Sequence, residues 1–389
     1  MLLPALKLSF FALPAGPEPS NGPTGGPGVS RDRTTGVRPD VIDRPGAFDY
    51  DTSTTMDTRF AKFVQEYRGR LAMPLCAYSG LEITGESVED LVTVPGSQFK
   101  AIMALNDRYR TSVLVTAIDT TVEAEAYGCE VKIPAREAPS VVGRLVTGSA
   151  DLALLADPVP GDARTRVPLE TAWRLTAEVG DRVPVVGAML GPFALAGRLF
   201  GLTEAVAATT TEPETIEALL DIVTGFLCRY ALEFRETGAW GILVAEAAAG
   251  QLPPEGVARF SAPFVKRIVK AVETPDFAVV LHNCHATVGH LDALLESGAS
   301  LFHFGAAMDM AAALARVPPE TVLAGNLDAT RLFLKSTPQA VGDAARALLA
   351  ATRPYKNFVI SSGCDVPPGA PLANLNAFFR AVGDFNKGD

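Results

Sequence analysis

The stretch Phe277-Ala-Val-Val-Leu-His-Asn-Cys284 decides how this chain of 389 residues is expected to fold. Its first five residues are an uninterrupted apolar run, which is typical of a parallel strand buried on both faces. Further short runs rich in apolar residues along the chain predict strands of the same kind. They lie at 112–118, 183–188, 240–245, 300–304, 321–325 and 357–361.

The segments between these runs carry helix signals. Residues 213–223 begin with Pro and acidic residues, residues 287–297 end before Gly298, and residues 337–349 begin with Thr followed by Pro. Repeated strand–helix units predict an α/β fold, a (β/α)8 TIM barrel with extra N-terminal helices, over residues 56–389. A doubly wound open sheet is the alternative, because seven strands are evident rather than eight and closure is inferred.

Composition excludes several classes of protein. With 48% hydrophobic and 20% charged residues, a large core is easily built. A net charge of -10 argues against nucleic-acid binding, which needs a basic face. No uncharged apolar run approaches the ~18 residues of a membrane-spanning helix, so no membrane partner is expected. The five cysteines are odd in number and scattered, which favours a reducing cytoplasm over a disulfide framework.

Residues 1–55 differ from the rest of the chain. Pro and Gly crowd residues 14–48, where large apolar residues are almost absent, so this stretch cannot offset its ordering entropy and is predicted to be disordered. Met56 opens a plausible helix, and one hypothesis is that it is the biological start. N-terminal sequencing of protein from the native host tests this hypothesis, and a mature N-terminus at Met1 would contradict it.

Chemically capable side chains gather where the predicted strands end. They are Asp119, Glu246, His282, Cys284, Asn326, Asp328 and Cys364. Barrel active sites are built at these C-terminal strand ends. Residues two apart on an extended strand point the same way, so His282 and Cys284 can share one ion.

One imidazole and two thiols, from His282, Cys284 and Cys364, form a ligand set for zinc. Three protein ligands leave a fourth tetrahedral position open, which is the arrangement of a catalytic rather than a structural ion. The chain has only four His and five Cys, so a His-x-Cys pair is not explained by abundance. The alternative is two buried thiols and a core histidine.

Three stretches resemble the uroporphyrinogen decarboxylase superfamily, and within it the zinc-dependent corrinoid methyltransferases that act on thiols. They are Leu281-His-Asn-Cys284, Gly325-Asn-Leu-Asp328 and the segment 362–374. Residues 117–128 and Gly191-Pro-Phe193 resemble further stretches of this branch, and the likeness covers roughly residues 60–383. Decarboxylases of the superfamily carry an Arg-Gln-Ala-Gly-Arg motif, whereas residues 73–80 here contain no arginine.

The resemblance implies zinc held by His282, Cys284 and Cys364, with Glu246 or water as the fourth ligand. It implies methyl transfer from a methylated corrinoid to a thiol acceptor such as coenzyme M. Asp119 and Asn326 are candidates for lining the mouth where the corrinoid docks. The chain has no Asp-x-His-x-x-Gly corrinoid motif, so the corrinoid is expected on a partner protein or as a free cofactor. Asp328 is expected to cap the following helix.

Other functions stay open at this point. The same zinc could activate a thiol that attacks an epoxide, an alkyl transfer found in the superfamily. Decarboxylation of a porphyrinogen needs no metal. A non-enzymatic barrel could bind a corrinoid or a protein partner. The identity of the thiol and the source of the methyl group do not follow from the motifs.

Overall fold

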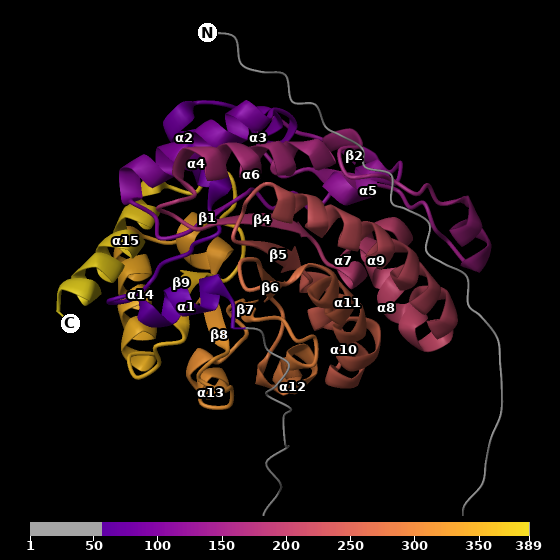
Figure 1. The fold of residues 1–389 in the computed structure, drawn as a ribbon. Coiled ribbons are helices and arrows are strands. Elements are labelled where there is room, and N and C mark those ends of the chain that lie inside the picture. Colours follow the sequence, from indigo (N-terminus) through magenta and orange to yellow (C-terminus); the bar gives the residue numbers. More distant parts are fainter. Residues whose placement is uncertain (1–56, 389) are drawn as a thin grey trace, which may run out of the picture. The chain divides into compact units, whose positions relative to one another are not determined.

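In the computed structural model, residues 57–388 are described. The predicted disordered extension, residues 1–55, and the proposed start at Met56 lie outside them. Seven parallel strands form one sheet in the order β1-β4-β5-β6-β7-β8-β9 (Figure 1). The strands are β1 (Leu114–Val115), β4 (Val185–Leu190), β5 (Gly241–Ala245), β6 (Ala278–Asn283), β7 (Leu301–Phe304), β8 (Val322–Leu327) and β9 (Phe358–Ser362).

All seven predicted strands are present and parallel, so the predicted α/β class is confirmed. The strand order follows the sequence in one direction and never reverses, which excludes the doubly wound alternative, because such sheets reverse at a switch point. Beyond β9, Ala72 forms a parallel bridge with Ile360, and Met73 N donates to Ile360 O at 3.0 Å. Residues 71–73 thus extend the sheet. Closure into an eight-stranded barrel stays a prediction, because β1 pairs only with β4 within residues 57–388.

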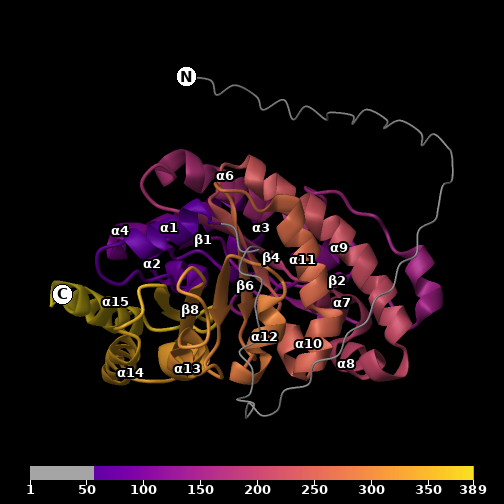
Figure 2. The same cartoon turned by 60° about the horizontal axis from the view of Figure 1, so that its bottom comes forward.

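The sequence did not predict a short antiparallel pair between β1 and β4. It consists of β2 (Glu130–Lys132) and β3 (Ser140–Val142). The helices lie around the strands (Figures 1 and 2). Helices α1–α4, which precede β1, are the predicted N-terminal additions. The helices are α1 (Arg59–Glu66), α2 (Leu81–Thr84), α3 (Val88–Thr93), α4 (Pro95–Tyr109), α5 (Val122–Ala126), α6 (Arg166–Val179), α7 (Pro192–Phe200), α8 (Leu202–Thr211), α9 (Pro213–Glu236), α10 (Pro254–Phe260), α11 (Ala262–Val272), α12 (Leu291–Leu295), α13 (Met310–Leu314), α14 (Pro338–Ala351) and α15 (Leu372–Lys387).

The predicted helix signals act as expected. Helix α9 begins at Pro213 and continues to Glu236 because its buried aromatic residues extend the apolar stripe past residue 223. Thr337 caps α14 by accepting from Ala340 N at 3.3 Å. The segment after β6 becomes a 3-10 turn followed by α12, and the chain then turns at Gly298, whose φ of 73° suits glycine. Within residues 57–388, no helix is both long and apolar enough to cross a lipid bilayer.

Helix α1 covers the end of the sheet opposite the candidate site. Its Arg59 N donates to Pro275 O at 2.6 Å, in the loop that leads into β6. Gln65 Nε2 donates to Pro319 O at 3.4 Å and to Glu320 O at 3.3 Å, in the loop that leads into β8. Helix α1 therefore leaves the C-terminal strand ends uncovered, where the predicted ligands lie.

A buried carboxyl at this same end makes stability depend on pH. Glu273 Oε2 accepts from Val279 N at 2.8 Å and from Ser300 Oγ at 2.9 Å, and burial raises its pKa from 4.5 to about 7. Between pH 4.5 and 7 the unfolded chain releases a proton that the folded chain retains. The free energy of unfolding therefore falls as pH rises through this window, by about 3 kcal/mol for this group.

The side chain of Glu273→Gln cannot titrate. The free energy of unfolding of this variant minus that of the wild type should therefore be about 3 kcal/mol larger at pH 8 than at pH 5. Urea unfolding at both pH values measures this difference. Glu296→Gln is the matched control, because Glu296 is exposed and lies in the segment between α12 and β7. Parallel pH profiles for Glu273→Gln and the wild type would contradict the assignment.

Candidate metal centre

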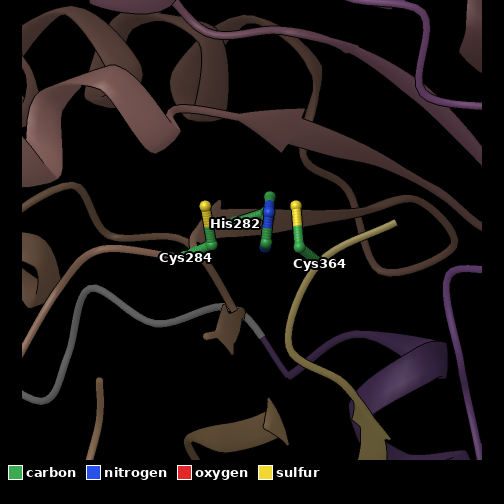
Figure 3. A group of neighbouring side chains, drawn as sticks. All are labelled: His282, Cys284 and Cys364. Atoms are coloured by element: carbon green, nitrogen blue, oxygen red, sulfur yellow. The ribbon is translucent and has the colours of Figure 1, made fainter. Parts of the chain in front are cut away.

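Three predicted ligands meet at the C-terminal end of the sheet. His282 lies near the end of β6, Cys284 follows β6, and Cys364 follows β9. One ring nitrogen of His282 and the two sulfur atoms all lie within 4.8 Å of one another. Figure 3 shows His282 between the two cysteines, with the three side chains directed to the same side. Within residues 57–388 this is the only such cluster of three potential ligands.

The loop that carries Cys284 is held in shape by Asn283. Its side-chain oxygen accepts from His285 N at 3.1 Å and from Ala286 N at 3.0 Å, which turns the chain directly after the strand. Its amide nitrogen donates to Glu246 O at 3.0 Å, at the end of the neighbouring β5. Cys284 is therefore placed by a turn that is itself tied to the sheet.

A hydrogen bond joins the two thiols. The Cys364 thiol donates to the Cys284 sulfur, which lowers the pKa of Cys284. The same bond, together with burial, raises the pKa of Cys364 to about 12. A divalent cation that displaces the thiol protons would gain two thiolate ligands.

A series of hydrogen bonds places the proton of the His282 ring on Nδ1. Ser361 Oγ donates to Met73 O at 2.5 Å, and it therefore accepts from His303 Nε2 at 2.7 Å. Burial, together with the neighbouring His282, holds the pKa of His303 well below its usual value, so its ring is neutral. His303 Nδ1 then accepts from His282 Nδ1 at 2.8 Å, which leaves the Nε2 lone pair of His282 free for a metal.

These hydrogen bonds predict that His303 increases metal affinity without being a ligand. We expect His303→Phe to weaken zinc binding by about 10- to 100-fold, the usual cost of losing the hydrogen-bond partner of a ligand. His303→Asn keeps an acceptor near the Nδ1 position and should lose less. Competition with a chromophoric chelator measures the affinity. Equal affinities for the wild type and His303→Phe would show that the ring only fills space.

The donor set fits zinc. One imidazole nitrogen and two thiolate sulfurs are ligands that zinc prefers, and carboxylates are absent from the cluster. Hard cations such as Mg²⁺ and Ca²⁺ require oxygen ligands instead. Three protein ligands would leave one position of a tetrahedral ion open to a substrate atom.

A cavity of about 180 Å³ adjoins this cluster. His282 and Cys364 line it, and so does His285, whose Nδ1 lies 3.5 Å from the Cys284 sulfur. Most of its remaining walls are apolar, with Thr120, Arg198 and Gln251 as further polar groups. A small molecule in this cavity would contact the cluster.

Residues 71–385 match the uroporphyrinogen decarboxylase (URO-D) family. The chain belongs to the URO-D family. A methylcobamide:CoM methyltransferase, MtbA, from Methanosarcina acetivorans is 29% identical over 270 residues, which cover 69% of this chain and 78% of that protein. A uroporphyrinogen decarboxylase from a Synechococcus species is 29% identical over 220 residues, which cover 54% and 61%.

A solved structure, a methyltransferase from Methanosarcina mazei, superposes with a TM-score of 0.75 at 23% identity. The match covers 85% of this chain and 99% of that one, so the two share a fold. The resemblance drawn from the strand-end motifs is confirmed. The expectation of a URO-D family enzyme is confirmed with it, since the matched relatives are named as enzymes.

Within this URO-D fold, Glu246 does not join the cluster, which corrects its prediction as a fourth ligand. Its carboxylate turns toward the start of α7, where it accepts from Phe193 N and Ala194 N, each at 2.9 Å. It also accepts from Ser261 Oγ at 2.9 Å. These bonds occupy both oxygens, and burial raises the pKa of Glu246 to about 7. Glu246 therefore caps a helix next to the site.

Asp119 and Asn326 lie at strand ends of the URO-D fold but outside the cluster. Asp119 forms a buried ion pair with Arg164, and its other oxygen accepts from Thr121 N at 2.9 Å. Asn326 Nδ2 donates to Met308 O at 2.6 Å and so holds the loop after β7. Asp328 caps the following turn, as predicted, by accepting from Arg331 N at 2.7 Å. Contact of Asp119 and Asn326 with a corrinoid stays a prediction.

Two residues of the site were not predicted as functional. His303 lies inside an apolar strand, which is typical of a structural residue, yet it pairs in register with His282 across β6 and β7. Two histidines at matched positions of adjacent strands were the available signal. Arg198 is the one charged residue in the apolar run of α7, which was a signal too.

Proposed function

We propose that the chain is a zinc-dependent methyltransferase that moves a methyl group from a methylated corrinoid to a thiol such as coenzyme M. The convergence of His282, Cys284 and Cys364 beside one cavity is the observation that carries this proposal. The similarity to a protein named as a methylcobamide:CoM methyltransferase supports it. The absence of arginine from residues 73–80 disfavours a pocket for the carboxylates of a porphyrinogen.

His282, Cys284 and Cys364 would hold the ion. A bound Zn²⁺ would lower the pKa of the acceptor thiol at neutral pH while two thiolate ligands keep it a mild Lewis acid. His303 holds His282 in the tautomer that presents Nε2. The apolar walls of the cavity exclude water from the acceptor sulfur.

The methyl transfer itself is a substitution at carbon. The acceptor sulfur attacks the methyl carbon of the corrinoid, a carbon–sulfur bond forms as the carbon–cobalt bond breaks, and cobalt keeps the electron pair as cob(I)alamin. The chain lacks an Asp-x-His-x-x-Gly motif, so the corrinoid would come from a separate protein or as a free cofactor. It would dock at the C-terminal strand ends near Asp119 and Asn326. We place this reaction in the cytoplasm, where thiols stay reduced.

The experiment combines metal analysis with spectroscopy. Purified protein is expected to contain close to one zinc per chain, and mixing it with methylcob(III)alamin and coenzyme M should produce the cob(I)alamin spectrum. Removal of the metal with a chelator should abolish this change, and added zinc should restore it. Protein that contains no zinc and leaves methylcob(III)alamin intact with every thiol would overturn the proposal.

The same preparation separates the alternatives. Release of CO2 from a porphyrinogen by metal-free protein would identify a decarboxylase. Consumption of an epoxide in the presence of coenzyme M, without any change in the corrinoid spectrum, would identify an alkyl transferase.

A further inference from the structure

Arg198 forms no ion pair within residues 57–388, and it faces the cavity of the candidate metal centre. It lies on α7, whose other residues, from Pro192 to Phe200, are apolar or glycine and buried. Arg198 itself is partly buried, and it lines the same 180 Å³ cavity as His282 and Cys364. The only charged side chain of an otherwise apolar helix is therefore directed to the place where a substrate would bind.

No acidic residue among the described residues 57–388 forms an ion pair with Arg198. Its Nη2 donates to Thr120 Oγ1 at 2.9 Å, which is a neutral acceptor. The nearby Asp119 is paired with Arg164 instead. The other nearby carboxyl, Glu123, accepts from Leu190 N at 2.8 Å, and burial raises its pKa to about 7. The guanidinium thus keeps several N–H donors for a group from outside the chain.

A partly buried guanidinium that forms no ion pair is unfavourable in the free protein, because it has lost water and the nearby carboxyls of Asp119 and Glu123 attract it without direct contact. A planar guanidinium matches the oxygen atoms of a sulfonate or a carboxylate, and such charge-assisted bonds are about twice as strong as neutral ones. The small side chains Ala194, Ala245 and Ala248 line the same cavity and leave room for a short carbon chain.

We propose that Arg198 binds an anionic group, a sulfonate or a carboxylate, at the end of the thiol acceptor opposite its sulfur. The acceptor is then a short mercapto acid that spans the cavity, with its sulfur at His282 and Cys364 and its anion at Arg198. This inference rests on the proposed function, and it adds the residue that selects the acceptor.

The test compares thiols of similar length and different charge. The anionic thiols are 2-mercaptoethanesulfonate and 3-mercaptopropionate, and the neutral one is 2-mercaptoethanol. For the wild type, we expect kcat/KM with methylcob(III)alamin to be about 10- to 100-fold higher for the anionic thiols, the value of a charge-assisted hydrogen bond. Arg198→Met should bring this ratio close to one, and Arg198→Lys should keep part of it.

Arg346→Met is the matched control, because Arg346 is an exposed arginine of α14 that pairs with Asp343. Its ratio should equal that of the wild type. A second measurement needs no turnover: calorimetry should detect ethanesulfonate binding to the wild type and to Arg346→Met, and at least about 10-fold weaker binding to Arg198→Met.

The outcomes are distinct. An unchanged ratio of kcat/KM for anionic over neutral thiols in Arg198→Met overturns the role of Arg198. A wild type that neither binds ethanesulfonate nor prefers anionic thiols overturns it too. In both cases, methyl transfer to 2-mercaptoethanol still supports the proposed function. Failure of every thiol to demethylate the corrinoid, with zinc bound, overturns the proposed function instead. If Arg198→Met does not fold, Arg198→Lys and the wild-type binding of ethanesulfonate decide the question.

Discussion

Cys364→Ala is expected to abolish metal binding and methyl transfer together. The substitution leaves His282 and Cys284 as the remaining ligands of the cluster and removes the thiol that lowers the pKa of Cys284. Because a catalytic metal contributes several kcal/mol to the transition state, we expect the rate to fall by roughly 10³-fold or more. Elemental analysis should find well under one zinc per chain, and the corrinoid assay gives the rate.

The control for this experiment is another free cysteine. Cys228 lies on α9, is partly buried, and is not among the clustered ligands. Cys228→Ala should therefore keep both the metal and the rate. A Cys364→Ala protein that retains one tightly bound zinc and full activity would show that Cys364 is only a packing residue.

Gly305→Ala is expected to disrupt the centre although it removes no ligand. Gly305 follows β7, and a Cβ atom there would lie 2.1 Å from the Cys284 carbonyl oxygen and 2.6 Å from the Cys284 Cα. Those are backbone atoms, so the loop that carries Cys284 has to move. Overpacking costs about 1–3 kcal/mol in stability. Displacement of a site residue by about 1 Å costs about 10²-fold in rate.

Gly383→Ala provides the comparison. Gly383 lies in α15, and a Cβ atom there would meet no heavy atom within 4 Å. Alanine is the better helix residue by about 0.5–1 kcal/mol, so this variant should be slightly more stable than the wild type and should bind zinc equally well. Equal zinc affinity in Gly305→Ala and Gly383→Ala would show that Cys284 adapts to the added methyl group.

The strands and the metal cluster could be predicted because each depends on local patterns. Apolar runs such as 277–281 predict buried parallel strands, and parallel strands place their following residues at one end of a sheet. His282, Cys284 and Cys364 therefore had to lie at the same end, although helices α12–α14 and strands β7–β9 separate Cys364 from the other two. The two-residue spacing of His282 and Cys284 set their common direction.

What the sequence could not predict depends on partners far away in the chain. The carboxylate of Glu246 could turn toward a metal or toward a helix, and the start of α7 at Phe193, together with Ser261, decided between them. Residues 71–73 were not recognised as part of the sheet, because their pairing with Ile360 gives no local pattern. The lack of an ion pair at Arg198 within residues 57–388 likewise depends on the pairing of Asp119 with Arg164.

The hydroxyl group of Ser361 links the maturation of the metal centre to protein synthesis. Met73, whose carbonyl oxygen takes the Ser361 proton, precedes Ser361 by 288 positions. Ser361 also follows His282 by 79 positions, which a ribosome covers in roughly 4–16 s at about 5–20 residues per second. Until then His282 and Cys284 have neither the third ligand nor an oriented imidazole. We therefore expect the proposed zinc site to bind its ion only after the segment with Ser361 and Cys364 has emerged from the ribosome.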